Sequence, residues 1–262
     1  MSGFLESVGG RVLHVFEETG QVLILLLRTL RGAGDIFRKF HRTSVQLVRV
    51  GNESLPIAAA MALFTGMVLA LHSGYALRQY SSESLLANIV ALSMVKEMSP
   101  VLTGLLLAGR IGAAFTAEIG TMRVNEEIDA LETLSISPIR YLCVPRLAAC
   151  VIMMPALVIY ADIVGVLGGG AIASAYFDMP LNSYFEAVFN SVWMQDVMEG
   201  LSKGVVFGVL IATISCHHGL ETRGGARGVG EAITHSVVDS FVWVFISNYF
   251  VTRFFVSITP LS

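Results

Sequence analysis

The sequence predicts an all-α integral membrane protein, in which an N-terminal region at the membrane interface precedes five transmembrane helices. Composition is the first observation behind this prediction: 54% of the 262 residues are hydrophobic and 14% are charged, whereas soluble domains carry about 25% charged residues. The second is that five separate stretches are apolar over the roughly 20 residues with which a helix crosses a bilayer. The net charge of −3 leaves no basic surface for a phosphate backbone, so no nucleic-acid partner is expected.

Residues 1–53 have the pattern of amphipathic helices that lie in the membrane interface. Apolar residues such as Phe4 and Phe16 alternate with seven lysines and arginines, whose long side chains reach toward the headgroups while the apolar face is buried. Acidic residues near the start of the chain argue against a cleavable signal peptide. A sixth span through residues 13–30 is the alternative interpretation.

Residues 54–257 form the expected membrane domain. Its spans are predicted, in order, at about 54–78, 84–113, 145–175, 197–219 and 232–256, and a further helix at about 116–136. Small residues recur every four positions in three of these spans, for example Gly200, Gly204 and Gly208. Such stripes let helices approach closely in a bilayer, either within one chain or between protomers. The three cysteines lie in or beside apolar runs, and we interpret them as small apolar side chains rather than as disulfide or metal ligands.

The distribution of basic residues predicts the orientation of the chain. Residues 1–53 carry seven lysines and arginines, the connection after the second span four, and the connection after the fourth span two, whereas the opposite side carries Arg78 alone. Cytoplasmic connections are enriched in lysine and arginine. The N-terminus is therefore expected in the cytoplasm and the C-terminus on the periplasmic side.

The connection over residues 116–136 is expected to form a short amphipathic helix on the cytoplasmic side. Val124, Ile128 and Leu131 follow a helical spacing, and acidic residues cover the other faces. A helix of this kind suits docking into a groove on a soluble partner. The alternative is a solvated helix that rests on the membrane surface.

The second span contains the adjacent charges Lys96 and Glu97, followed by Pro100. Counted from Ser84, Glu97 lies about 20 Å into the span at 1.5 Å per residue. Charges at this depth are costly and by default indicate function, and the proline removes a backbone hydrogen bond and is expected to bend the helix. The alternative is a structural ion pair with Asp162, Lys203 or Arg253 on other spans.

Two rival functions start from the same sequence. An ion-coupled secondary transporter or channel would use Glu97, Asp162 and Lys203 as a relay. An intramembrane enzyme would need a catalytic constellation, and the only candidate is the tripeptide Cys216-His217-His218, which lacks a metal-ligand spacing. The glycine-rich residues 224–230 lack the Lys-Ser/Thr of a P-loop, so no nucleotide site, cofactor or metal is expected in this chain.

Several long motifs in a fixed order resemble the MlaE (YrbE) permease family. They are KEMSPVLT from Lys96, followed by AGRIGAAFTAEIGTMRVNEEIDAL, then SPIRYLCVPRLAA, ADIVGVLGG and GLETRGGARGVGEAITHSVV. The resemblance extends from about the second span to the fifth, and one departure is Ser99, where the family pattern has glycine before the proline.

The resemblance implies the permease subunit of an ABC-type phospholipid transporter in the inner membrane of a Gram-negative bacterium. Such a transporter moves lipid between the inner membrane and a periplasmic MCE protein and maintains outer-membrane lipid asymmetry. The implied partners are a second copy of the chain in a homodimer, a cytoplasmic ATPase that holds ATP and Mg²⁺, a STAS-domain protein, and a periplasmic ring of MCE-domain proteins. Neither the direction of transport nor the headgroup preference follows from the sequence.

The resemblance also assigns roles to individual residues. The coupling helix at about 116–136 would dock on the ATPase, with contacts from Glu118, Arg123, Glu126, Glu127, Asp129 and Leu131. Lys96 and Glu97 would lie near the lipid pathway. A phospholipid needs an apolar cleft for its acyl chains, and we expect its walls to include Leu69, Tyr75, Leu77 and Tyr80.

Overall fold

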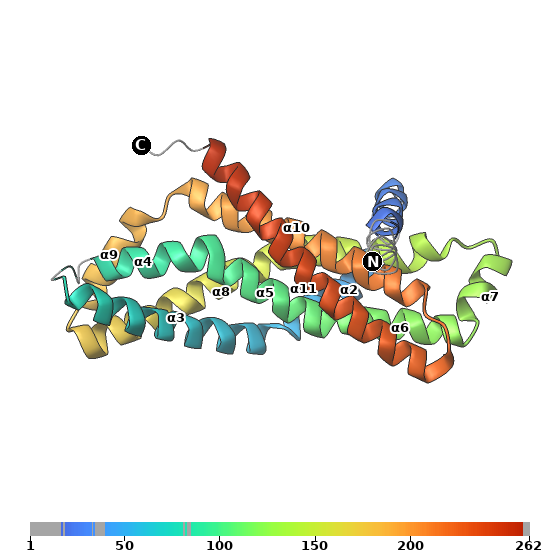
Figure 1. Ribbon diagram of the computed structural model, residues 1–262, viewed down its shortest axis with the longest axis horizontal. Helices are drawn as coiled ribbons and strands as arrows, with labels where there is room; N and C mark the ends of the chain where they lie inside the picture. The colour runs from blue at the N-terminus through green and yellow to red at the C-terminus, as the bar shows by residue number, and fades with distance from the viewer. Residues whose placement is uncertain are drawn as a thin grey trace, which may run out of the picture.

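The computed structural model describes residues 17, 19–32, 34, 40–80, 82 and 85–258. Within these residues every regular element is a helix, which confirms the predicted all-α class. Five helices are long and apolar enough to cross a membrane: His41–Arg78, Leu86–Val124, Ile139–Phe177, Met194–Leu220 and Gly225–Ile258. They lie side by side in one elongated bundle, with α7 at one end and α9 at the other (Figure 1). We call these the α7 end and the α9 end.

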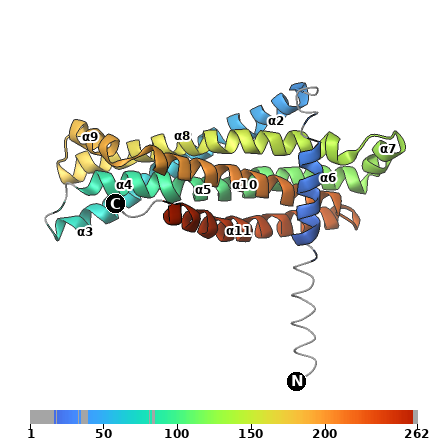
Figure 2. The same ribbon diagram turned by 90° about the horizontal axis from the view of Figure 1, so that it is seen from above.

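The first described helix covers residues 19–31, and it lies across the bundle rather than along it (Figure 2). We call it the crossing helix. This direction agrees with the interfacial interpretation and not with a sixth span. The expectations for Phe4 and Phe16 fall outside the described residues. Helix α2 (Phe40–Asn52) follows and leads into α3 (Leu55–Arg78), which has a proline in its first turn, where no intrahelical hydrogen bond is lost.

The second span is built from alternating α and π turns. In order these are α4 (Leu86–Ser93), η3 (Met94–Met98), α5 (Ser99–Leu107), η4 (Ala108–Gly112) and α6 (Ala113–Val124). A π turn holds one more residue than an α turn and is frequent at functional sites. Turn η3 contains both Lys96 and Glu97 and ends two residues before Pro100, so the irregularity in this helix coincides with its charged pair.

The helix expected over residues 116–136 is divided in two. Helix α6 continues to Val124, and the short α7 (Glu127–Thr133) follows after Glu126, whose φ of 61° is left-handed. A left-handed residue without glycine's freedom ends a right-handed helix, so α7 takes its own direction at the end of the bundle (Figure 1). The chain returns through η5 (Ile139–Cys143) into α8 (Val144–Phe177).

The remaining helices are α9 (Leu181–Ser191), α10 (Met194–Leu220) and α11 (Gly225–Ile258). Helix α9 is an addition to the predicted elements. It is fixed by Tyr184, which is fully buried and donates a hydrogen bond to the carbonyl of Val166 at 3.2 Å. Burial raises the pKa of Tyr184 to about 12, so the phenol stays a donor at any physiological pH.

Close helix contacts are made at glycines, and they lie within one chain. Helix α3 packs along α8, and a Cβ on Gly66 would lie 1.9 Å from the carbonyl oxygen of Gly165. On α10, a Cβ on Gly200 would lie 2.4 Å from the carbonyl oxygen of Val95, and one on Gly208 2.8 Å from that of Cys150. The small-residue stripe of α10 is therefore used for contacts inside the protomer, as such stripes allow in a bilayer.

Burial differs sharply between the last two helices. Helix α10 is packed between α8, α6 and α11, and buried residues occur along its whole length. On α11 the buried residues are Ser236, Ser240 and Val244, and the other faces of its second half are exposed and apolar. The three cysteines are buried and free.

Candidate functional site

The charged pair of the second span belongs to a cluster of five charges that joins η3 to α10. We call it the midspan cluster; its members are Lys96, Glu97, Asp196, Glu199 and Lys203. The Nζ atom of Lys203 lies 2.6 Å from Glu97 Oε1 and 3.2 Å from Glu199 Oε1, and it donates to the carbonyl of Lys96 at 2.6 Å. The Lys203 side chain has no exposed surface, so three oxygen atoms replace the water around a buried ammonium.

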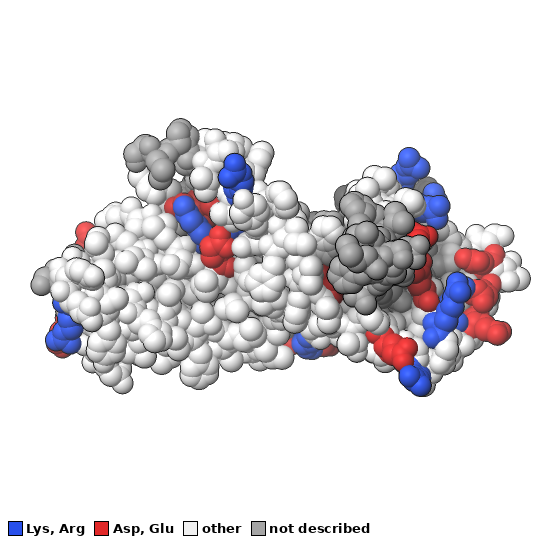
Figure 3. Space-filling view, in the orientation of Figure 1, with Lys and Arg blue, Asp and Glu red and all other residues white. Residues whose placement is uncertain are grey.

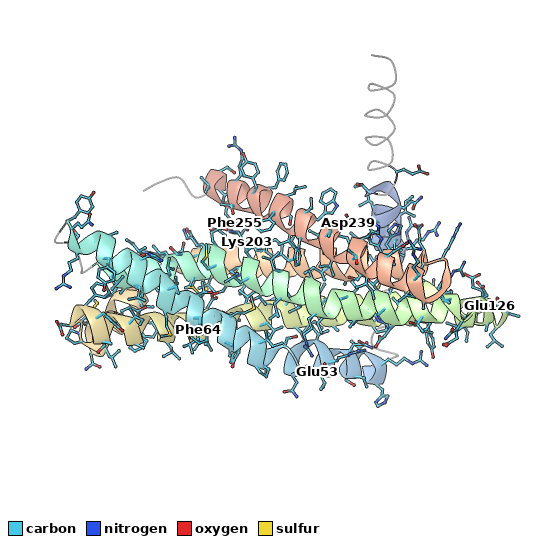
Figure 4. All side chains as sticks on the ribbon, turned by 60° about the horizontal axis from the view of Figure 1, so that its bottom comes forward. Glu53, Phe64, Glu126, Lys203, Asp239 and Phe255 are labelled. Atoms are coloured by element: carbon cyan, nitrogen blue, oxygen red, sulfur yellow. The ribbon has the colours of Figure 1, made fainter. Side chains whose placement is uncertain are left out.

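Helix α11 supplies two neutral donors to the same carboxylate. Asn248 Nδ2 donates to Glu97 Oε2 at 2.9 Å, and Thr252 Oγ1 donates to Glu97 Oε1 at 2.9 Å. Glu97 is thus bound by side chains from α10 and α11 while a third of its own side chain stays exposed. Figure 4 labels Lys203 between α11 and the second span in that view.

The neighbouring lysine has a separate partner on the same helix. Lys96 Nζ lies 2.7 Å from Asp196 Oδ1, and Asp196 Oδ2 also accepts the backbone N–H of Trp193 at 2.8 Å, at the start of α10. Asp196 and Lys203 are seven residues apart, which is about two helical turns. Adjacent residues of the second span therefore both reach α10, but at different heights, and the Lys96 side chain keeps 39% of its surface exposed.

Of the three pairing partners considered from the sequence, the structure brings together Glu97 and Lys203. Asp162 lies on α8 and Arg253 on α11, and neither is among the ion-pair partners of Glu97 in the described part of the chain. The relay of Glu97, Asp162 and Lys203 is thus only partly assembled. The sequence analysis missed Asp196 and Glu199, although the spacing of Glu199 and Lys203 by four residues is a signal for an ion pair along one helix.

The apolar residues expected to line a lipid cleft lie on α3 or just after it. Leu69 and Leu77 are half-buried against a core formed by α3, α4, η3, α8 and α9. Tyr75 is exposed and makes an edge contact with Phe177, with ring centroids 5.6 Å apart, and Tyr80 is also exposed. The described residues of that core include none from α10 or α11. In the described part of the chain, the ion pair and hydrogen bonds of Glu97 involve none of these four residues.

Nearer the α7 end a second set of charges joins α2, α6 and α8. We call it the junction cluster; its members are Arg49, Glu118 and Arg146. Arg146 Nη2 lies 2.8 Å from Glu118 Oε2, and Arg49 pairs with Glu118 Oε1. Arg146 is buried and also donates to the carbonyl of Leu142 at 2.9 Å. Glu118, which the sequence assigned to contact with a partner, is therefore held by two arginines of its own chain.

The other residues assigned to partner contact lie at the α7 end. Arg123 and Asp129 form an ion pair at 2.5 Å, Ile128 is buried against the bundle, and Leu131 is half-buried. Glu126 and Glu127 are exposed. Figure 3 shows acidic side chains gathered at this end, and Figure 4 labels Glu126 at its tip. The helix α7 thus uses one apolar residue to pack on the bundle and presents acidic groups outward.

Comparison with known proteins identifies the family. Residues 43–254 match the family described as Permease MlaE. The chain belongs to the MlaE permease family. It is 41% identical over 249 residues to a probable ABC transporter permease protein of Rickettsia bellii, covering 95% of this chain and 96% of that protein. It is 34% identical over 250 residues to the intermembrane phospholipid transport system permease protein MlaE of Haemophilus influenzae, with 95% and 96% covered.

Further relatives come from photosynthetic organisms. A probable ABC transporter permease protein of a Synechocystis species is 42% identical, with 92% of this chain and 89% of that protein covered. The family assignment confirms the resemblance seen in the sequence motifs. It makes this MlaE-family chain a multi-pass permease, and it gives the midspan cluster a place in a transport subunit. No group of three or more potential metal ligands lies together among the described residues.

Proposed function

We propose that this MlaE-family chain is the membrane subunit of an ATP-driven phospholipid transporter. In this proposal it moves lipid between the bacterial inner membrane and a periplasmic MCE-domain protein and so maintains the asymmetry of the outer membrane. The printed name of the Haemophilus relative, an intermembrane phospholipid transport system permease, supports the substrate class. The observation that carries the proposal is the midspan cluster, because an open set of charges within a span is suited to a lipid headgroup.

The chemistry of the midspan cluster fits a zwitterionic or anionic headgroup. Lys96 is the more exposed of its two lysines, and Glu97 is the exposed carboxylate. A phosphate would displace water from the ammonium of Lys96 and replace part of its pairing with Asp196. Lys203, which is fully buried, holds Glu97 in place rather than binding lipid itself.

The exposed face of α11 supports a homodimer. Its second half exposes large apolar residues, including Phe245, Tyr249 and Phe250, on the helix that also carries Asn248. A second copy packed on this face would enclose the midspan clusters of both protomers and would bring apolar walls to a common cleft. The expected cleft residues Leu69, Tyr75, Leu77 and Tyr80 would then meet the cluster only across the assembly.

The energy source is a separate ATPase, which holds ATP and Mg²⁺ and docks at α7, with a STAS-domain protein attached to it. Glu126 and Glu127 are exposed at the start of the short amphipathic helix α7, and this supports docking. In this proposal the α7 end lies in the cytoplasm, and the α9 end and the MCE ring lie on the periplasmic side. The excess of lysine and arginine near the α7 end supports this orientation.

The first experiment tests the midspan cluster. In the assembled transporter, Glu97→Ala and Glu97→Lys are expected to impair phospholipid transfer from inner-membrane vesicles to the MCE protein while leaving the complex intact. Glu186→Ala, an exposed glutamate on α9, is the matched control. Transfer at the wild-type rate by both Glu97 variants would refute the assignment of Glu97 to the lipid pathway.

The second experiment tests docking at α7. Charge reversal at Glu126 and Glu127 together is expected to reduce co-purification of the ATPase. The introduced basic side chains would face a surface of the ATPase that is complementary to acidic groups, and like charges across an interface repel. Glu186→Lys makes the same kind of change at the α9 end and is expected to leave co-purification unchanged. Full retention of the ATPase by the double reversal would count against α7 as the docking element.

A further inference from the structure

The crossing helix, α10 and α11 enclose two adjoining cavities near the α7 end. Their volumes are about 220 and 180 Å³, and they share the lining residues Thr19, Val22, Ile214 and Trp243. We call them together the side groove. Small-molecule sites commonly measure about 300–1,000 Å³, so the two cavities together have the size of a ligand site. None of the midspan residues lines it.

The two halves of the side groove differ in chemistry. In addition to the shared residues, the larger cavity is lined by the polar His217, His218 and Asp239 and by the apolar Val242 and Ile246. His218 Nε2 lies 2.7 Å from Asp239 Oδ2, and the Asp239 side chain is 41% exposed. The smaller cavity has no titratable residue in its described lining; apart from Thr213, the residues that it adds are aliphatic: Leu23, Leu26, Val209 and Leu210. The groove is therefore polar at one end and apolar at the other.

The polarity of the groove follows depth in the membrane. Asp239 is the last charge on α11 before residues 240–252, which carry none. On α10, His218 lies in the last turn, and Val209 is nine residues earlier, about 14 Å along the helix. The polar side chains are thus at the level where α11 becomes uncharged, and from there the apolar lining extends toward the middle of the spans along both α10 and α11. A membrane lipid has the same order with depth: a polar headgroup at the surface and apolar chains toward the middle of the bilayer.

We propose that the side groove binds a phospholipid whose headgroup ends in a primary ammonium. The ammonium pairs with Asp239, whose carboxylate has acceptor sites beyond the one used by His218. The phosphate lies beside His217 and His218, and one acyl chain follows the apolar half. Of the described lining residues none is an arginine or lysine, so a carboxylate without a strong cation favours a headgroup that brings its own positive charge.

Figure 4 labels Asp239 on α11 beside the crossing helix, away from Lys203. The side groove is therefore a second lipid site, separate from the midspan cluster. The inference deepens the proposed function and rests on it in one respect: a lipid held near the α7 end lies in the opposite leaflet from the route through the midspan cluster, where it is placed to load the transporter or to be unloaded from it.

The chain offers its own reporter for a test. It has two tryptophans, of which Trp243 lines both halves of the groove and Trp193 is exposed at the α9 end. In a Trp193→Phe background the full chain is purified in detergent and titrated with phosphatidylethanolamine that carries bromine on its acyl chains. Bromine quenches tryptophan fluorescence on contact, so occupancy of the groove is expected to give saturable quenching of Trp243.

Two variants and one control connect the signal to the groove. Asp239→Asn is expected to raise the half-saturating lipid concentration by about tenfold, equivalent to about 1.4 kcal/mol. Val22→Phe, which fills both cavities from the crossing helix, is expected to lower the amplitude of quenching and serves if Asp239→Asn does not fold. Asp178→Asn, the same change at the α9 end in a left-handed position that asparagine tolerates, is expected to leave the titration unchanged.

Several outcomes of the titration would contradict a phospholipid site in the side groove. Quenching that rises in proportion to lipid without saturation, or that is equal with brominated diacylglycerol, would mean bulk lipid contact only. Equal affinity for brominated phosphatidylglycerol would overturn the ammonium assignment. Failure of this test together with normal ATP-driven lipid transfer by the wild-type complex would remove the site and leave the proposed function standing. Saturable quenching in a chain whose complex transfers no lipid would support the site and count against the proposed function.

Discussion

The midspan and junction clusters are built from the same kinds of group but with opposite balance. Each contains one buried cation, Lys203 or Arg146, and one carboxylate that is about one-third exposed, Glu97 or Glu118. The junction cluster has two arginines for one carboxylate, and the midspan cluster has two lysines for three carboxylates. Both bind helices to each other across the bundle.

The difference distinguishes a structural contact between helices from a candidate ligand-binding site. Arginine's planar fork holds a carboxylate in a fixed geometry, and at the junction two arginines bind the one carboxylate and so connect α2, α6 and α8. In the midspan cluster the ammonium groups are compact, an acid is in excess, and neutral donors from α11 complete the shell of Glu97. An arrangement with spare acid and an exposed Lys96 is able to exchange a partner for a ligand.

The largest effect is expected at the centre of the midspan cluster. Lys203→Met leaves Glu97 and Glu199 without their buried cation, and breaking a buried ion pair from one side costs about 3–5 kcal/mol. Unfolding in mild detergent is the measurement. The double variant Glu97→Gln/Lys203→Met is expected to be more stable than Lys203→Met alone, because one unpaired carboxylate is removed. Equal stability of the two would show that the cluster is not coupled in this way.

A smaller loss is expected at the junction. Arg146→Met removes a buried guanidinium from Glu118 and from the carbonyl of Leu142, but Glu118 stays partly solvated and keeps Arg49. We expect a decrease in the free energy of unfolding of about 1–3 kcal/mol, measured in the same detergent. ATP-driven transfer per folded complex is expected to stay within about a factor of two, because the ion pair and hydrogen bonds of Arg146 go to Glu118 and Leu142 and not to the midspan cluster. Loss of transfer without loss of stability would instead make the junction cluster part of the lipid pathway.

The smallest effect on stability is expected at the exposed lysine. Lys96→Met removes an ion pair in which one partner keeps 39% of its side-chain surface exposed, and such pairs contribute about 0–1 kcal/mol. Lipid transfer is nevertheless expected to fall, because Lys96 is the accessible cation of the cluster. A variant that is clearly less stable than the wild type, or one that transfers lipid at the wild-type rate, would show that Lys96 has a structural role like that of the junction cluster.

Much of the fold could be predicted because hydropathy is a local signal. The five spans follow from apolar runs, and Lys96 and Glu97 stand out because they interrupt one. The pairing of Glu97 with Lys203 spans 106 residues and depends on which helices touch, which a single sequence does not specify. Asn248 and Thr252 are ordinary polar residues until α11 is placed beside η3. The helix break at Glu126 could not be predicted, because no glycine or proline lies beside it in the sequence. Helix α9 is too short to give a hydropathy signal.

The helix that carries α7 is much longer than a bilayer is thick. Leu86–Val124 has 39 residues, about 58 Å against a hydrocarbon core of about 30 Å, and Val124 is about 40 Å from Glu97. The junction cluster joins this length to α2 and α8. In the proposed complex the ATPase docks at α7, so a movement that it imposes there acts outside the hydrocarbon core and far along the helix from Glu97.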